Sequence, residues 1–269
     1  MGEVAGRGEG SGFRWLRAGH VLTVTLDRPE RRNAFDWAMR LGLEGFWTDV
    51  AADAGVRCVV VTGAGPGFCA GADVSDLAAD RAPRGDGVHD ELAFLPGRRL
   101  DVPVVVAVNG VCAGGGLHFV ADGDVVIAAA SASFLDTHVA VGQVSGLEPA
   151  ALALRAPLGV IGRLALTGRA GRLDASGALA AGLVSEVVDD DTLANRAKEL
   201  ADAIAAASPS AVRATRRVLR RMEARLVEPA LEEGWAAVVA HWEHPDAQEG
   251  AQAFLERRDP VWEEPAPGQ

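Results

Sequence analysis

The stretch VPVVVAVNGVCAGGGLH, residues 102–118, decides the fold class of this 269-residue chain. A short apolar run rich in β-branched residues stops at a glycine, as a buried strand does, and a Gly-rich turn then leads into a helical segment. The same order recurs around residues 57–73, and residues 124–129 repeat the strand pattern. Strands that alternate with helices predict an α/β fold.

The rest of the chain divides into three parts. Residues 1–12 are rich in Gly, Glu and Arg and are expected to form a flexible tail. Residues 13–207 are expected to form the α/β core, which begins with a strand at 21–27 and a helix at about 35–52. Residues 208–269 carry no strand pattern, and they predict a helical C-terminal region with helices at 210–223, 228–241 and 245–257.

Composition argues against several classes of function. A formal net charge of −11 makes nucleic acid or an anionic membrane a poor main partner. The N-terminus lacks the apolar core of a signal peptide, and no apolar run is long enough to cross a bilayer, so a cytoplasmic protein is expected. Cys58, Cys69 and Cys112 lie in apolar or Gly-rich surroundings without metal-ligand spacing, which predicts buried thiols.

Two Gly-rich turns are the first candidates for a binding site. Residues 67–73 read GFCAGAD and residues 113–116 read AGGG, and each turn follows a predicted strand and opens a helix. Such a turn exposes backbone N–H groups, and the helix dipole adds a partial positive charge, so these turns favour a negatively charged oxygen. A plain tight turn explains either segment alone, but the pair at this spacing favours an oxyanion site.

These segments, together with FLDTH at residues 134–138, resemble the crotonase (enoyl-CoA hydratase/isomerase) superfamily. The resemblance implies a spiral of repeated ββα units with a helical C-terminal trimerisation region, and hence a homotrimer or homohexamer. It also implies that the N–H groups of Ala72 and Gly115 hold the oxygen of a thioester enolate. Residues 79–88 lie where the family's active-site cover sits.

The resemblance also implies residues that bind coenzyme A (CoA) as part of the substrate. Arg28 and Arg31 belong to a stretch that lies beside the nucleotide in this family, and arginine offers bidentate donors to phosphates. A solvated turn of mixed charge is the alternative for either arginine. Asp73 is expected to lie near the adenine or to cap the helix that follows. The other expected contacts are Ala70, Gly114, Phe254 and Arg257.

Two histidines, His118 and His138, stand where enoyl-CoA hydratases carry two catalytic glutamates. Imidazole acts as a general acid or base with an ordinary pKa near 6.5, so activity is expected to change between roughly pH 6 and 7.5. A metal is not expected, because no third ligand of suitable spacing stands out. No cofactor other than the CoA of the substrate is expected.

Two acids are candidates for orienting these histidines. Asp136 lies two residues from His138 and shares its face if the segment is extended. Glu148 lies further along the chain, but Ser145 and Glu148 also fit a capping box at the start of a helix. The capping box is the preferred interpretation of Glu148.

Three functions agree with these features. The first is enolate-stabilising chemistry on an acyl-CoA, most simply the addition of water by a lyase. The second is hydrolysis of a carbon–carbon bond in a β-dicarbonyl compound, because superfamily members with that activity also use a histidine in this second region. The third is a catalytically silent acyl-CoA-binding protein that has lost the glutamates.

Overall fold

Two β-sheets form the core of the computed structural model, which describes residues 5–74 and 87–263. The strands are β1 (Ala5–Gly10), β2 (Phe13–Ala18), β3 (Val21–Leu26), β4 (Cys58–Gly63), β5 (Gly67–Cys69), β6 (Val104–Val108), β7 (Val111–Ala113), β8 (Val125–Ala129), β9 (Ser133–Leu135), β10 (Leu173–Asp174) and β11 (Glu186–Val188). The larger sheet has seven strands in the order β1-β2-β3-β4-β6-β8-β11, and the smaller has four in the order β10-β9-β7-β5. From β3 onward the larger sheet is parallel.

Consecutive strands alternate between the two sheets. Strands β4, β6 and β8 lie in the larger sheet, and the strands that follow them, β5, β7 and β9, lie side by side in the smaller sheet. The second strand of a pair leads into helical structure: after β7 come the 3-10 helix η2 (Gly114–Gly116) and α5 (Leu117–Asp122), and after β9 comes η3 (Val139–Val141). The predicted α/β class and the repeated ββα arrangement are thereby confirmed.

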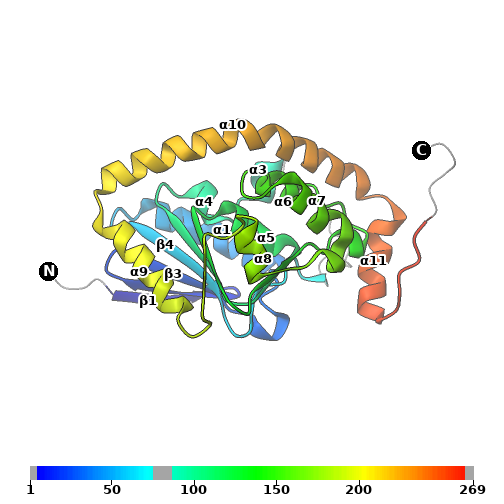
Figure 1. The fold of residues 1–269 in the computed structure, drawn as a ribbon, viewed down its shortest axis with the longest axis horizontal. Coiled ribbons are helices and arrows are strands. Elements are labelled where there is room, and N and C mark those ends of the chain that lie inside the picture. Colours follow the sequence, from blue (N-terminus) through cyan, green and yellow to red (C-terminus); the bar gives the residue numbers. More distant parts are fainter. Residues whose placement is uncertain (1–4, 75–86, 264–269) are drawn as a thin grey trace.

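The helices surround the sheets, as Figure 1 shows. The long α10 runs across one side of the molecule, and α11 packs beyond its far end. The remaining helical elements are α1 (Trp37–Ala52), α3 (Val88–Glu91), α4 (Pro96–Arg99), α6 (Leu147–Leu152), α7 (Leu158–Thr167), α8 (Ala175–Ala180), α9 (Leu193–Ala206), α10 (Pro209–His241), α11 (Pro245–Glu256), η1 (Pro29–Arg31) and η4 (Gly168–Gly171).

Helix α1 shows how the local sequence produces the packing. It begins after Asp36, whose side chain accepts a hydrogen bond from the Met39 N–H at 2.8 Å and so caps the helix. Its buried residues, Met39, Leu43, Trp47 and Val50, recur at the spacing of one helical face. The Trp47 indole donates to the Phe94 carbonyl at 2.8 Å, which satisfies its polar atom inside the core.

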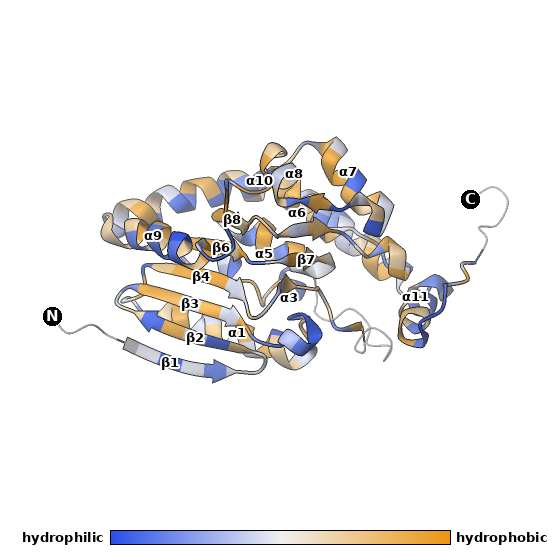
Figure 2. Ribbon diagram, turned by 60° about the horizontal axis from the view of Figure 1, so that its bottom comes forward, coloured by the Kyte–Doolittle hydropathy of each residue, from blue (hydrophilic) through white to orange (hydrophobic). Residues whose placement is uncertain are grey.

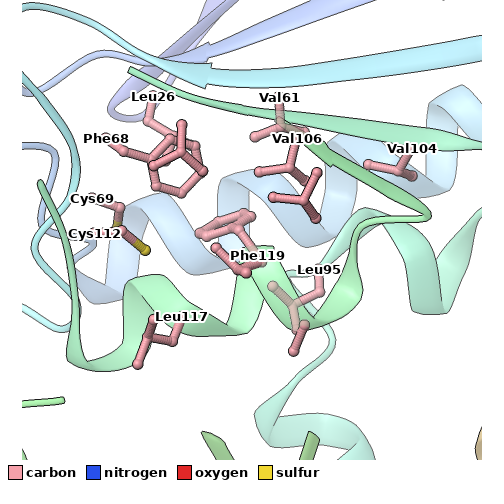
Figure 3. Packing of buried hydrophobic residues seen from close by; sticks show 14 of the residues in the cluster. Leu26, Val61, Phe68, Cys69, Leu95, Val104, Val106, Cys112, Leu117 and Phe119 are labelled. Atoms are coloured by element: carbon pink, nitrogen blue, oxygen red, sulfur yellow. The ribbon is translucent and has the colours of Figure 1, made fainter. Parts of the chain in front are cut away.

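The main core lies between the sheets and the helices that cover them. Figure 2 shows the central strands β3 and β4 as largely apolar, whereas β1 at the edge is not. In Figure 3, Phe68 and Phe119 approach each other beside Leu26, and Cys69 and Cys112 lie next to each other. All three cysteines are buried, as predicted, and burial raises the pKa of Cys69 to about 12.

One helix of the C-terminal region is tied to the core by buried charge. Arg216 of α10 is 5% exposed, and its Nε donates to Asp124 Oδ2 at 2.8 Å. Its other nitrogens donate to the carbonyls of Leu100 at 2.5 Å and Gly97 at 2.9 Å. This pairing satisfies the guanidinium, so α10 is held over α4 and the end of α5. No helix in residues 5–74 or 87–263 is long and apolar enough to cross a membrane.

Two predictions about the ends of the chain are wrong. Residues 5–10 are not a flexible tail, because they form β1 and pair with β2 along its whole length, from Ala5 opposite Ala18 to Gly10 opposite Phe13. The helices expected at 210–223 and 228–241 are one helix, α10, which continues through Pro229. The proline removes one backbone donor without ending the helix. Residues 79–86 of the expected active-site cover lie outside the described residues.

Candidate active site

The site lies at one edge of the smaller sheet. Strands β5, β7 and β9 are parallel and end at Cys69, Ala113 and Leu135. The carboxyl ends of parallel strands meet at the same edge, where ligands commonly bind in α/β proteins. The residues that follow these strands are Ala70–Asp73, Gly114–Gly116 and Asp136–His138, so the sheet brings all three predicted segments together.

Two neighbouring backbone segments, around Ala72 and around Gly115, lie in this region. Phe35 pairs with the segment after β5 by donating to the Gly71 carbonyl at 2.9 Å and accepting from the Asp73 N–H at 3.0 Å. The N–H of Ala72, between them, donates to none of the described residues. Gly115 is the second residue of η2, and N–H groups in the first turn of a helix have no acceptor within it.

Close approach of the backbones explains the glycines. A Cβ on Gly71, whose φ is +91°, would lie 2.9 Å from both the Gly115 nitrogen and the Ala113 oxygen. A Cβ on Gly115 would lie 3.6 Å from the Ala72 nitrogen and 2.7 Å from the Phe35 ring. The two candidate donors therefore belong to segments in direct contact, and glycine is what permits the contact.

A cavity of about 680 Å³ joins these backbone segments to distant parts of the chain. Eight predicted site residues line it: Arg31, Ala70, Ala72, Asp73, Gly114, Gly115, His138 and Phe254. The sequence analysis missed Arg169 and Arg172, which also line the cavity. The Arg169 guanidinium lies 5.7 Å from the centre of the Phe254 ring. No sequence motif marked these two arginines, because they follow α7, far from the Gly-rich turns.

Five predicted site residues do not line this cavity: Arg28, Arg257, His118, and the two acids Asp136 and Glu148, which are described below. Arg28 donates to Asp36 at 3.0 Å and to Asp73 at 3.2 Å, so it is held within the protein rather than directed at a phosphate. Arg257 ends α11 in the left-handed conformation, with φ of 57°. His118 lines a second cavity, described below. The geometry therefore favours neither the phosphate contact nor the solvated turn for Arg28, because its side chain is 18% exposed and paired with Asp36 and Asp73.

His138 is held by a buried carboxylate. Its Nδ1 lies 2.7 Å from Asp136 Oδ1, which also accepts from the His138 backbone N–H at 3.0 Å. The other oxygen of Asp136 accepts from the Ser145 hydroxyl at 2.5 Å, and Asp136 is 1% exposed. Asp136 thus occupies the orienting position predicted for it, and Ser145 is a partner that the sequence did not reveal.

Glu148 lies between the two histidines. Its Oε1 is 2.9 Å from His118 Nε2 and 3.4 Å from His138 Nε2, and the residue is 3% exposed. The preferred capping-box interpretation is wrong: Gly146 is the N-cap of α6 without a side-chain hydrogen bond, and Ser145 donates to Asp136 instead. The first turn of α6 directs Glu148 into the site rather than back to its own helix.

Charge decides the protonation of this cluster. Burial alone would lower the pKa of His138, but the charge of Glu148 and the hydrogen bond and charge of Asp136 outweigh it and raise the pKa to about 9. Burial alone would raise the pKa of Glu148, but its interactions with His118 and His138 lower it to about 2. At neutral pH, His138 is therefore an imidazolium and Glu148 a carboxylate. The expected pH range of 6 to 7.5 is too low for His138.

His118 has one occupied nitrogen and one unpaired nitrogen. Because Glu148 is an acceptor, His118 Nε2 carries the proton between them, and a neutral ring then has a bare lone pair on Nδ1. That Nδ1 is buried and has no hydrogen-bond partner among the described residues. His118 also lines a second cavity, of about 620 Å³, bounded by α3, α4, α5 and α10. Glu148 contacts one histidine from the lining of each cavity, His118 from the second and His138 from the first.

The same cluster changes the argument about metals. Ligand atoms of Asp136, His138 and Glu148 lie within 4.8 Å of one another. The reason given for expecting no metal, the lack of a third ligand, is therefore wrong, because folding supplies two carboxylates beside His138. In the described structure these atoms pair with each other as an imidazolium between carboxylates.

Comparison with known proteins agrees with this geometry. The family model described as enoyl-CoA hydratase/isomerase matches residues 17–265. The mevalonyl-coenzyme A hydratase sidH of Aspergillus fumigatus is 36% identical over 256 residues, which cover 90% of this chain and 91% of that protein. The enoyl-CoA hydratase EchA19 of Mycobacterium tuberculosis is 35% identical over 253 residues, which cover 91% of this chain and 93% of that protein.

Solved structures share the fold. The carnitinyl-CoA hydratase from Mycobacterium avium superposes with a TM-score of 0.82 at 34% identity, covering 93% of this chain and 98% of its own. An enoyl-CoA hydratase/isomerase from Pseudoalteromonas atlantica superposes with a TM-score of 0.82 at 29% identity, covering 94% of this chain and 100% of its own. The chain therefore belongs to the enoyl-CoA hydratase/isomerase family, the crotonase superfamily that its Gly-rich turns resemble.

Proposed function

We propose that this protein stabilises the enolate of an acyl-CoA thioester and, most simply, adds water to an enoyl-CoA. The N–H groups of Ala72 and Gly115 bind the thioester oxygen. One observation carries the proposal: these two residues line one cavity together with the cationic His138. Preorganised donors aimed at a developing oxyanion contribute on the order of 3 kcal/mol each to catalysis.

The histidines take different roles in this mechanism. Water attacks the β-carbon and loses a proton to the unpaired Nδ1 of His118, while the α-carbon takes a proton from His138. The donated proton is the one on His138 Nε2, because its partner Glu148 is 3.4 Å away whereas Nδ1 is held at 2.7 Å by Asp136. Water is thereby added across the double bond with no net change in protons.

Glu148 returns the cluster to its starting state. After one turnover His118 carries an extra proton and His138 Nε2 has none. Both Nε2 atoms contact the same oxygen, Glu148 Oε1, at 2.9 and 3.4 Å. The carboxylate accepts the His118 Nε2 proton and passes it to His138, and His118 shifts to the tautomer needed for the next cycle once its ring reorients. The path needs no group other than the three side chains.

The two cavities bind different portions of the substrate. The CoA portion lies in the cavity with Arg31, Arg169 and Arg172, whose positive charges suit its phosphates. Phe254 is 48% exposed and offers a ring face to the adenine. The acyl portion passes the histidine cluster and extends into the second cavity. The relatives named above as hydratases of CoA thioesters support this assignment.

A second candidate is hydrolysis of a carbon–carbon bond in a β-dicarbonyl compound. The observation that favours it is the 2.7 Å pairing of His138 with Asp136, a histidine supported by a buried acid. In this reaction the oxyanion donors would hold the enolate that leaves when the bond breaks. A catalytically silent acyl-CoA-binding protein would use the same cavities without turnover.

One experiment separates these functions. Purified protein is mixed with crotonyl-CoA, and loss of the enoyl absorbance is followed beside parallel reactions with a simple β-diketone and with its CoA thioester analogue. Hydration of the enoyl thioester supports the first function, and cleavage of the diketone supports the second. Binding of CoA thioesters by calorimetry without any turnover would leave only the silent protein.

We also propose assembly into a homotrimer or homohexamer. Helix α10 exposes an apolar stripe at one-turn spacing, with Val218, Met222 and Leu226 between 57% and 68% exposed. Such a stripe on a helix calls for a covering surface. Light scattering at micromolar concentration is expected to show a trimer or hexamer. The double substitution Met222→Glu with Leu226→Glu is expected to weaken the association of the subunits. A monomeric parent protein would contradict the proposal.

A further inference from the structure

The second cavity contains an acceptor that the proposed reaction does not use. The cavity lies between α3, α4 and α5 on one side and α10 on the other, and its inner end is His118. Apolar side chains line much of it, among them Leu92, Leu95 and Val227. Glu228 of α10 also lines it. Within the described residues, Glu228 Oε2 is buried and accepts no hydrogen bond.

The neighbours of Glu228 leave this oxygen available. Arg98 approaches the other carboxylate oxygen, with its Nη1 3.4 Å from Oε1. His89 Nε2 lies 3.6 Å from Oε2, beyond hydrogen-bond distance, and the side chains of His89 and Glu228 are 69% and 29% exposed. A buried acceptor without a donor loses the hydrogen bonds it had to water. A ligand that brings a donor to Oε2 would restore them.

Charge around the cavity limits what that donor is. Six arginines line the cavity: Arg98, Arg99, Arg216, Arg217, Arg220 and Arg221. Five acidic residues line it as well, so the cavity carries mixed charge: Asp90, Asp101, Asp122, Glu223 and Glu228. A cationic ligand group at Glu228 Oε2 would lie beside Arg98, which already faces the same carboxylate. A carboxylate would place its own acceptors against Glu228, and most of the arginines already have carboxylate partners, such as Asp124 for Arg216 and Arg220. A neutral donor, a hydroxyl group, suits both the acceptor and the surrounding charge.

We propose that the second cavity is a subsite for an acyl group that carries a hydroxyl beyond the reacting carbons, with Glu228 Oε2 as its acceptor. The inference rests on the proposed function, because it places the distal acyl portion in this cavity. It makes Glu228 a specificity-determining residue. Sites built to bond a substrate hydroxyl reject analogues that lack it, since the buried acceptor is then left unpaired.

Equilibrium binding tests this without turnover. Saturated straight-chain acyl-CoA thioesters of increasing length, each with and without a terminal hydroxyl, are titrated by calorimetry. For the length that reaches Glu228, the hydroxylated thioester is expected to bind about tenfold more tightly than its unsubstituted partner. Glu228→Leu is expected to remove this difference while keeping the affinity for the unsubstituted thioester, which also shows that the variant is folded. Glu228→Ala, which also lacks an acceptor, serves if the leucine variant does not fold.

Glu232→Gln is the matched control, because Glu232 lies one turn further along α10, is exposed and does not line the cavity. It is expected to keep the tenfold preference. Equal affinity for the paired thioesters at every length would overturn the inference, as would tighter binding of an ω-carboxyl or ω-amino thioester. If no thioester binds at all, the proposed function fails as well, so the two failures are distinguishable.

Discussion

The backbone segments around Ala72 and Gly115, proposed above as the oxyanion region, and the histidine–carboxylate cluster lie at the same edge of the smaller sheet, but they are built differently. The oxyanion region uses N–H groups of two short turns, and glycine at Gly71 and Gly115 permits their contact. The cluster uses side chains from α5, α6 and the segment after β9, and its charge balance holds it together. The first region depends on shape and the second on protonation.

The largest expected effect comes from breaking the backbone region at Gly115. Gly115→Pro removes the N–H assigned to the thioester oxygen, and turnover is expected to fall at least about a hundredfold. Gly115→Ala is the matched control, because it adds the same Cβ near Phe35 but keeps the N–H. Steady-state kinetics on both variants separates the lost donor from the steric change.

Circular dichroism establishes that both Gly115 variants are folded. If the proline variant is folded and turns over substrate as fast as the alanine variant, the Gly115 N–H has no part in catalysis.

The next largest effect is expected from a substitution at Glu148, which lies at the centre of the histidine–carboxylate cluster. Glu148→Gln removes the negative charge that raises the pKa of His138, so this pKa should fall from about 9 toward its ordinary value. Turnover at neutral pH is expected to drop by about ten- to a hundredfold, and the alkaline limb of the pH–rate profile to move to lower pH.

Glu186→Gln is a control for the loss of a paired carboxylate elsewhere, since Glu186 pairs with Arg196 at 2.8 Å on the surface. Its pH–rate profile should match the parent's. A Glu148→Gln profile with an unchanged alkaline limb would show that Glu148 does not set the protonation of His138.

Protonation of the cluster also links stability to pH. The pKa of His138 in the folded state, about 9, lies above the ordinary 6.5, so its imidazolium stabilises the fold below pH 6.5, and this stabilisation is lost as pH rises through 9. The free energy of unfolding from urea titrations is expected to fall over this range by on the order of 1–3 kcal/mol more in the parent than in His138→Gln. The same slope in both proteins would contradict the raised pKa.

The smallest expected effect comes from removing the hydrogen bond that Ser145 makes to Asp136, the acid that holds His138. Ser145→Ala removes the hydroxyl that donates to Asp136 at 2.5 Å but leaves the Asp136–His138 pair in place. A loss of about threefold in turnover is expected, because Ser145 acts on the reacting atoms only through Asp136, so only a part of the roughly 1.5–3 kcal/mol of a hydrogen bond to a charged group affects the barrier. Ser145→Thr, which keeps the hydroxyl, should recover most of it. Equal turnover rates for the alanine variant and the parent would show that Ser145 does not contribute to catalysis.

The fold follows from local patterns. Apolar β-branched runs at β4, β6 and β8 are buried on both faces in a parallel sheet, so they appear in the sequence as uninterrupted stretches. Strand β1 was missed because it reads AGRGEG, with three glycines and little apolar content, and it exists only through pairing with β2. In β1, pairing with β2 therefore outweighs the low β-propensity of the residues themselves.

The site residues also divide into those that the local sequence predicts and those that only the packing reveals. The Gly-rich turns are contiguous in sequence, so the two segments were predicted from it directly, and the resemblance to the crotonase superfamily singled out Ala72 and Gly115 within them. The partners of the histidines were not, because Glu148 reaches His118 only after α5 and α6 pack together. A capping box and a buried charge share one sequence pattern, and only the packing distinguishes them.

That cluster also explains why histidines suit these positions. Asp136 and Glu148 already supply two buried carboxylates. Glutamates at residues 118 and 138 would bring four acidic groups into contact, and like charges at such distances cannot all ionise. Imidazoles at both positions instead pair with the acids and keep a transferable proton.

Exchange of the α-protons of a saturated acyl-CoA with deuterated water tests the central claim most directly, because it requires an enolate but no water addition. Incubated with the parent protein in deuterated water, butyryl-CoA is expected to gain deuterium at the α-carbon, detectable by mass spectrometry. Folded Gly115→Pro is expected to bind the thioester and exchange at least about a hundredfold more slowly. A parent protein that binds butyryl-CoA but incorporates no deuterium would contradict enolate stabilisation at this site.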